Sequence, residues 1–231
     1  CGCCFLVDRF FIRNNEKIKG TFFSSICILE SERGTGLSIT MLKEAIKQST
    51  LRKSIFSVLI SRRAVDYFYN KLSFWGISQY SKIIISKLES RLVNKNISFK
   101  NASNKDFNLI NSVYENSYLN SFGPCIRNED NWDYILNKSI HQNIFFKIII
   151  INEVFSGYMI FSKNVIYEIS LINKTNYLDV LDFYNKTFLE GEDIIIQSSE
   201  NHLLIKELSN SDFVIQKRQC NYGGHMVRVN T

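Results

Sequence analysis

The first part of the chain has the hydrophobic pattern of two strands followed by a helix. Residues 3–12 and 18–29 are rich in aromatic and β-branched side chains, and a polar turn separates them, so they predict a hairpin. A polar segment with two glycines follows at residues 30–36. From Leu37 the apolar positions recur with helical spacing, which predicts a helix, and residues 54–61 then predict a short strand.

The rest of the chain repeats this order of elements. A short helix marked by Phe68 precedes a predicted strand at residues 76–86, and the polar stretch at residues 87–95 has the composition of a boundary. The second part predicts the order β-α-α-β-β-β-α-β-α-β-β. The first part predicts β-β-α-β-α-β, which is the same order without its beginning.

These patterns predict an α/β (α+β) fold of two tandem units. Each unit is expected to hold a mixed, mostly antiparallel sheet flanked by helices. The units should cover residues 1–90 and 91–231, and the first should lack its amino-terminal strand and helices. We therefore expect the natural protein to begin earlier than this sequence, which has no initial Met and no secretory signal pattern.

Composition excludes several classes of protein. Of the 231 residues, 45% are hydrophobic and 22% are charged, as in a folded globular chain rather than a disordered one. No apolar run reaches the roughly 18 residues of a membrane helix, so no membrane partner is expected. The formal charge of +6 comes from scattered basic residues, which does not favour a nucleic-acid partner. The oligomeric state stays open.

The cysteines and histidines do not show metal-ligand spacing. Three of the six cysteines crowd the first four positions, and the three histidines lie far apart, so we expect no metal. We interpret the cysteines as buried, reduced thiols of a cytoplasmic protein.

The segment between the second strand and the first helix is the strongest candidate for chemistry. It reads Arg33-Gly34-Thr35-Gly36-Leu37-Ser38. Glycines let the backbone approach a phosphate, and the first amides of a helix have no internal acceptor. Arg33 adds a full positive charge. The segment is therefore a candidate pyrophosphate site, and the alternative is a plain strand-to-helix turn.

Two motifs resemble the GNAT superfamily of acyl-CoA N-acyltransferases. The segment from Arg33 to Ser38 is similar to its Arg/Gln-x-x-Gly-x-Gly/Ala signature, with Ser38 in place of the last Gly or Ala. Residues 68–74 resemble its Phe-Tyr-x-x-x-Gly-Phe segment, with Ser73 in place of Gly. The resemblance implies acetyl-CoA as co-substrate and an amine acceptor that we cannot name. It also implies that the strand at Ile26, Cys27 and Ile28 pairs with the pantetheine arm of the cofactor.

The resemblance also implies a catalytic role for Tyr69, as the general acid that protonates the departing CoA thiolate. The alternative is that Tyr69 only packs between helix and sheet. No general base is identifiable; Asp8 lies on a suitable strand, but we interpret it as a surface carboxylate. Trp75 and Tyr80 could line an acceptor pocket, although core packing is the simpler expectation.

The second unit is expected to be degenerate, because its corresponding segment at residues 172–176 has no glycine. This plan resembles that of tandem acetyltransferases of the enhanced intracellular survival type. The leading hypothesis is an N-acetyltransferase that transfers acetyl directly from acetyl-CoA to an amine. One alternative is a non-catalytic acyl-CoA-binding or interaction module. The other is a tandem-GNAT aminoacyltransferase that uses charged tRNA.

Overall fold

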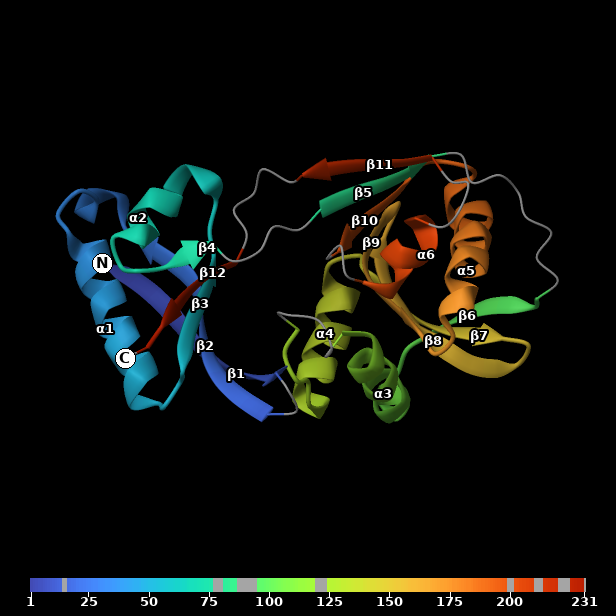
Figure 1. Cartoon of the computed structure of the whole chain (residues 1–231), viewed down its shortest axis with the longest axis horizontal. Coiled ribbons are helices and arrows are strands. Elements are labelled where there is room, and N and C mark those ends of the chain that lie inside the picture. Colours follow the sequence, from blue (N-terminus) through green and yellow to red (C-terminus); the bar gives the residue numbers. More distant parts are fainter. Residues whose placement is uncertain are drawn as a thin grey trace. The chain divides into compact units, whose positions relative to one another are not determined.

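The chain forms two compact units in the computed structural model (Figure 1). The structure describes residues 1–13, 16–76, 81–86, 95–118, 124–198, 202–209, 214–219 and 225–230. The first unit comprises Cys1–Gln79, Gly123–Ile126 and Cys220–Thr231, and the second comprises Tyr80–Phe122 and Arg127–Gln219. The predicted α/β class with two mixed sheets is confirmed.

The first unit is built on a five-stranded sheet. Its strands in spatial order are β1 (Gly2–Arg13), β2 (Glu16–Ile28), β3 (Phe56–Ile60), β12 (His225–Val229) and β4 (Trp75–Gly76). Only β2 and β3 run parallel; the other neighbours are antiparallel. Residues 124–126 lie along β1, where the Ile126 amide donates to the Phe10 carbonyl at 2.7 Å.

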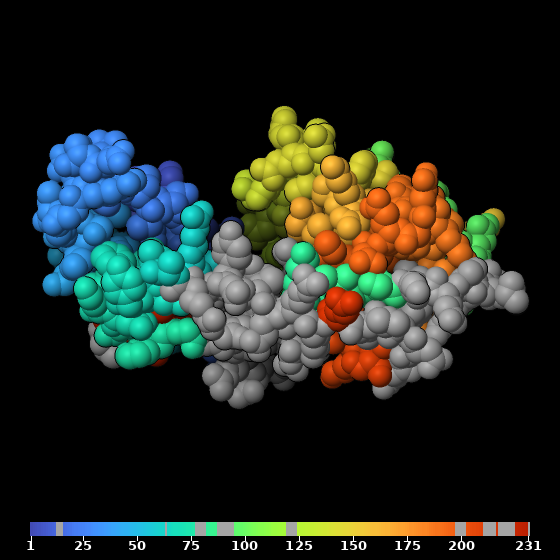
Figure 2. Space-filling view, turned by 90° about the horizontal axis from the view of Figure 1, so that it is seen from above, coloured from blue at the N-terminus to red at the C-terminus, as the bar shows by residue number. Residues whose placement is uncertain are grey.

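Two helices pack on one face of this sheet. They are α1 (Leu37–Leu51) and α2 (Asp66–Asn70), and both lie on the same side of the strands in Figure 1. The helical spacing of α1 brings Leu42 and Ala45 into a core with Phe23, Leu59 and Met226 of the sheet. Figure 2 shows the α1 segment in blue and the α2 to β4 segment in teal at the surface of this unit.

The second unit has a seven-stranded sheet with helices on both faces. The strands in spatial order are β11 (Val214–Gln219), β5 (Ser81–Ser86), β10 (Ile194–Ser198), β9 (Val165–Leu171), β8 (Val154–Ser162), β7 (Phe145–Ile151) and β6 (Ile97–Asn101). One core packs α3 (Phe107–Tyr118) and α4 (Glu129–His141) against side chains such as Ile148. The other core packs α5 (Tyr177–Tyr184) and α6 (Leu203–Ser209) against strand residues such as Ile149, which directly follows Ile148 on β7. Alternate side chains of one strand therefore serve opposite faces.

The units exchange strands, which the sequence pattern did not predict. β5, which we expected to close the first unit, lies between β10 and β11 of the second sheet. β12, which we expected to close the second unit, lies between β3 and β4 of the first sheet. The single strand predicted at residues 76–86 is therefore wrong, because its two ends belong to different sheets. The predicted boundary at residues 90 and 91 lies outside the described residues.

Within the part of the chain that the structure describes, the helices are too short or too polar to cross a membrane.

Candidate functional site

The two parallel strands of the first unit pair over a short distance and then separate. Gly20 to Phe22 of β2 lie opposite Phe56 to Val58 of β3. Beyond these residues β2 continues to Ile28, and no strand in the part of the chain that the structure describes pairs with it on that side. The sheet therefore has an open backbone edge at residues 23–28, in the middle rather than at its margin.

The backbone groups of this open edge can be assigned from strand alternation. The Leu29 amide donates to the Cys1 carbonyl at 2.8 Å, so Leu29 faces β1. Alternation then directs the amide and carbonyl of Ile28 and Ile26 away from β1, to the side that β3 has left. Ser25 has a φ of 50°, and the register between β1 and β2 shifts here, which marks a β-bulge.

The open edge leads directly to the glycine loop (residues 33–38) and to the start of α1. Gly34 and Gly36 have φ values of 83° and 84°, a conformation that favours glycine. A side chain at either position would meet nothing within 4 Å, so the backbone is accessible. The Ile39 amide donates to the Gly36 carbonyl at 3.1 Å. The amides of Leu37 and Ser38 have no acceptor among the described residues, and they offer an anion two free donors.

Charge around the glycine loop is mixed. The exposed Arg33 guanidinium lies 4.0 Å from the carboxylate of Glu30. The Thr35 hydroxyl donates to the Glu32 carbonyl at 2.7 Å, which fixes the turn before the helix. A bound anion would therefore draw Arg33 away from a weak surface ion pair rather than from a buried one.

Tyr69 packs against the same core as the side chain of Ile26, a residue of the open edge. It projects from α2 into the core that also contains Ile26, and its ring contacts Phe68 and Phe74 at centroid distances of 5.2 and 6.4 Å. Its hydroxyl makes no hydrogen bond with the described residues. Partial burial, with a smaller effect of Cys4, raises the pKa of the phenol, so it stays protonated at neutral pH.

The last residues of the 68–74 motif, Ser73 and Phe74, have a backbone conformation and a burial that explain their positions in it. Ser73 has a φ of 61°, so the position where the related motif has glycine does require a left-handed backbone. Phe74 is fully buried. Trp75 is 62% exposed, which contradicts the expectation of core packing. Tyr80 lies outside the described residues.

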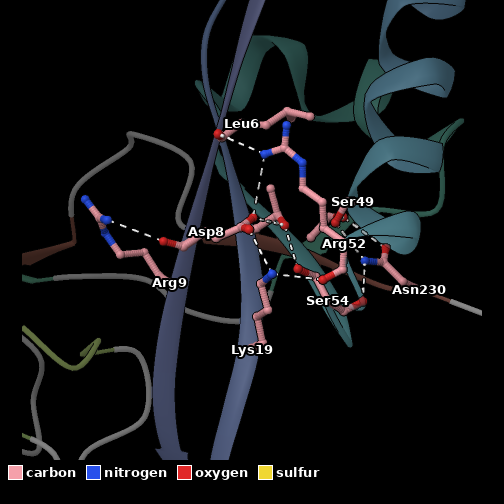
Figure 3. A network of polar contacts seen from close by, with 10 residues as sticks. Leu6, Asp8, Arg9, Lys19, Ser49, Arg52, Ser54 and Asn230 are labelled. Atoms are coloured by element: carbon pink, nitrogen blue, oxygen red, sulfur yellow. Dashed lines mark hydrogen bonds and ion pairs between the residues drawn. The ribbon is translucent and has the colours of Figure 1, made fainter.

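Asp8 is not the free surface carboxylate that we expected. Figure 3 shows it within a polar network, with Lys19 at 2.8 Å and Arg52 at 3.9 Å, and the Thr21 hydroxyl donates to it at 2.9 Å. Partial burial raises the pKa of Asp8, but the hydrogen bonds from Lys19 and Thr21 and the two positive charges outweigh it. The pKa is lowered overall. A carboxylate held ionised in this way is a poor proton acceptor.

The same network ties the last described residue to the first unit. The Asn230 amide group donates to the Ser49 hydroxyl and to the Ser54 carbonyl, each at 2.9 Å, and its oxygen accepts from Ser57 at 2.9 Å. These contacts lie where α1 ends and β3 begins (Figure 3). Asn230 is therefore held at the opposite end of β3 from the open edge.

Comparison with solved structures identifies the architecture. The chain superimposes on a GCN5-related N-acetyltransferase from Anabaena variabilis with a TM-score of 0.76, at 13% identity, over 99% of this chain and 59% of that one. It also matches Eis1 from Mycobacterium abscessus, with a TM-score of 0.65 and 12% identity over 99% of this chain and 60% of that one. The chain has the tandem GNAT fold. It spans about three fifths of the length of these proteins.

A third GNAT match shares the two-unit plan. It is a tandem GNAT protein from the clavulanic acid biosynthesis pathway, with a TM-score of 0.55 and 6% identity over 95% of this chain and 81% of that one. No family model matches the sequence, and no curated protein matches it. At these identities the structural likeness concerns the fold alone.

The second GNAT unit has the same separation of parallel strands, but side chains fill it. β9 pairs with β10 only at Val165 and Ile166 and then continues to Leu171. The Tyr118 hydroxyl donates to the Ile169 carbonyl at 3.0 Å and lies 3.3 Å from the Ile169 amide. The Tyr177 hydroxyl accepts from the Leu171 amide at 3.3 Å. The backbone groups that are open in the first unit are therefore satisfied within the chain.

A partly buried polar cluster lies on β9 next to Ile169 of this closed edge. Arg127 forms a bidentate ion pair with Glu168 at 2.6 and 2.7 Å, and the Tyr158 hydroxyl donates to Glu168 at 2.6 Å. The Arg127 guanidinium stacks on the ring of Trp132, 4.6 Å from its centroid. The pKa of Arg127 is raised despite its burial, because Glu168 stabilises the charge.

The helix that follows β9 has no free anion site. Asn173 accepts from the Thr175 amide at 3.1 Å and from its hydroxyl at 2.9 Å, so the side chain occupies the turn. The lack of glycine at residues 172–176 predicts this absence of a phosphate site from the sequence. Tyr118 and Tyr177 were missed, because a tyrosine on an apolar helix face gives no sign that its hydroxyl caps a distant strand.

Proposed function

We propose that this chain is an acyltransferase that binds acetyl-CoA in its first unit and transfers the acetyl group to an amine. The observation that carries the proposal is the open edge of β2, which continues into a glycine loop with free helix amides. The backbone groups of Ile26 and Ile28 would pair with the pantetheine arm, beside Cys27. The loop from Arg33 through Gly34, Thr35, Gly36 and Leu37 to Ser38 would hold the pyrophosphate.

The chemistry would be a direct transfer. The amine nitrogen attacks the thioester carbonyl, the tetrahedral intermediate collapses, and the carbon–sulfur bond breaks. The CoA thiolate then takes the phenol proton of Tyr69. The Tyr69 hydroxyl has no acceptor within the described ranges, and the raised pKa keeps the phenol protonated, and both features support this role. The proton lost by the amine goes to solvent, since Asp8 is held in its ion pairs, and the Tyr69 phenolate takes a proton back from solvent.

The same reasoning limits acetyl-CoA to one molecule per chain. Tyr118 and Tyr177 occupy the corresponding edge of the second unit, and Asn173 occupies the turn before α5. A cofactor would have to displace three sets of internal hydrogen bonds to bind there. We expect calorimetry to give a stoichiometry near one.

The binding site is tested by Gly36→Asp. A carboxylate at this position would cap the free amides itself and repel the pyrophosphate. We expect a loss of roughly 2 kcal/mol or more in acetyl-CoA affinity, about 30-fold. Calorimetry on the folded variant measures it.

Gly191→Asp is the matched control. Gly191 has a φ of 91°, and a side chain there also meets nothing within 4 Å, so the backbone strain is similar. It belongs to the second unit, whereas the glycine loop belongs to the first. Unchanged affinity in Gly36→Asp, or an equal loss in Gly191→Asp, would exclude the proposed site.

Release of free thiol from acetyl-CoA in the presence of a panel of amines separates an enzyme from a binding module. Binding without thiol release would favour a non-catalytic acyl-CoA-binding module. Activity that requires charged tRNA would favour an aminoacyltransferase.

A further inference from the structure

Two cysteines lie directly opposite each other on β1 and β2. The register of the hairpin pairs Cys3 with Cys27, and their Sγ atoms are 3.2 Å apart. Both side chains are exposed. This contradicts the expectation of buried thiols. The pair of accessible thiols joins β1 to β2, the strand that carries the open edge.

The geometry of the pair suits a covalent bond. Opposite residues of an antiparallel pair have Cα atoms about 4.5–5.5 Å apart, within the range that a disulfide requires. The sulfur atoms need to approach by only about 1 Å to reach bonding distance. A rotation of the two side chains supplies this movement, so the strands can keep their register.

We propose that Cys3 and Cys27 form a reversible disulfide, with a low-molecular-weight disulfide such as glutathione disulfide as the oxidant. One cysteine thiolate attacks a sulfur of the oxidant, which releases one thiolate and leaves a mixed disulfide. The second cysteine thiolate attacks the protein sulfur of that bond and releases the second thiolate. Two protein thiols are oxidised, one disulfide is reduced to two thiols, and excess reduced thiol reverses the reaction.

Cys1 and Cys4, the other cysteines near the start of the chain, do not have this arrangement. Cys1 is exposed directly before β1, but it lies opposite Leu29. Cys4 points into the core of the first unit, and burial, with a smaller effect of Cys3, raises its pKa to about 11. Its thiolate is therefore scarce at neutral pH. Exposed thiols that can pair reversibly are the kind that sense redox state in a reducing compartment.

The position of the pair links it to the bulge. The Cys3 thiol donates to the carbonyl of Ser25 at 3.3 Å, and Ser25 is the residue with the positive φ. Oxidation consumes this thiol proton and removes the hydrogen bond. The disulfide would thus modify β2 beside the open edge. Formation of the disulfide does not require bound acyl-CoA, and it can be tested without acyl-CoA.

The test incubates the full chain with glutathione at increasing ratios of oxidised to reduced form, followed by alkylation, trypsin digestion and mass spectrometry. We expect a link between the peptides of residues 1–9 and 20–33, with two thiols lost per chain. Cys27→Ser should abolish this link and leave a glutathione adduct on Cys3.

Because Cys1, Cys3 and Cys4 share one tryptic peptide, variants must assign the partner. Cys3→Ser should abolish the link, whereas Cys1→Ser, which removes an exposed thiol of the same peptide, should leave it intact. A link that persists in Cys3→Ser, or a wild-type chain that gains only glutathione adducts, would overturn the proposal. Reduction of the linked chain by excess glutathione should restore both thiols, and failure to do so would contradict reversibility.

Discussion

At the residue scale, Tyr69 separates a catalytic role from a structural one. Tyr69→Phe keeps the ring contacts with Phe68 and Phe74 and removes a hydroxyl that bonds to none of the described residues. The thermal stability should therefore change by about 1 kcal/mol or less. If the hydroxyl protonates the thiolate, the turnover number should fall about 10²-fold or more. The Michaelis constant for acetyl-CoA should stay nearly constant, because the interaction matters in the transition state.

Tyr67 gives a control on the same helix. Its side chain is 66% exposed, so Tyr67→Phe should change neither stability nor turnover. The comparison needs an accepted amine and a wild type that turns over. Full turnover in Tyr69→Phe would contradict the assignment, and a lower melting temperature with normal turnover would make the tyrosine structural.

Ser73 tests the backbone rather than the chemistry. Its φ of 61° is a conformation that costs a side-chain-bearing residue about 1–2 kcal/mol. Ser73→Gly should relieve this strain and leave the protein as stable or slightly more stable. Ser73→Val should destabilise it by roughly 1–2 kcal/mol, because a β-branched residue tolerates this region poorly.

Chemical denaturation measures the difference between the two variants. Ser24, which is exposed on the extended β2, gives the matched control, since Ser24→Val suits a strand and should cost little. Equal stability of Ser73→Gly and Ser73→Val would show that the left-handed backbone is not enforced.

At the element scale, the residue that directly precedes α6 in the second unit is a histidine whose titration should be visible. His202 is 2% exposed, and its Nδ1 accepts from the Leu204 amide at 3.2 Å, which leaves the proton on Nε2 without a partner among the described residues. Burial lowers its pKa from 6.5 to about 4, although the charge of Glu168 opposes this shift.

The sign of the effect follows from this lowered pKa. Between pH 6.5 and about 4 the unfolded chain binds a proton that the folded chain does not, so stability should fall as the pH decreases. The loss should approach roughly 3 kcal/mol near pH 4. His202→Phe keeps an aromatic ring against Tyr118 and Tyr177 and should remove this part of the pH dependence.

Denaturation curves between pH 7 and pH 4 measure this effect. His141 is exposed at the end of α4, and His141→Gln should leave the wild-type slope unchanged. The same slope in His202→Phe as in the wild type would mean that another group titrates.

Much of the element order could be predicted because periodicity is a local property. The helix from Leu37 and the strand predicted at residues 54–61, which forms β3, follow from the pattern of their apolar side chains. The glycine loop could be recognised because Gly34 and Gly36 do adopt the left-handed conformation that glycine permits. The exposure of Cys27 and Trp75 could not, because an apolar or aromatic residue on a strand gives no information about which face is covered.

At the scale of the whole molecule, the exchange of strands between the two sheets also could not be predicted from the sequence. The patterns at residues 81–86 and 225–229 fit a strand of either sheet equally well. Strands pair through backbone groups, which are the same in every residue and do not specify the partner strand. The chain enters the first unit three times, through residues 1–76, 124–126 and 225–230. Each unit therefore depends on segments that lie far away in the sequence, and division near residue 90 would remove β12 from the first sheet.

Met226 tests this dependence. It lies on β12 opposite Leu59 and Gly76, is 3% exposed, and belongs to the core of the first unit although most of the chain separates it from α1. Met226→Ala should leave a cavity there and destabilise the first unit by about 2–5 kcal/mol. Hydrogen exchange should show the loss of protection in β3 and α1.

Val229 provides the control on the same strand. Its side chain is 64% exposed, so Val229→Ala keeps the backbone pairing with Phe56 and should change protection little. The helices α5 and α6 should keep their protection in Met226→Ala, because their core contains no residue of β12. Loss of protection there, with β3 unaffected, would contradict the exchange of strands. Parallel loss in both units would instead show that the exchanged strands make the two units unfold as one.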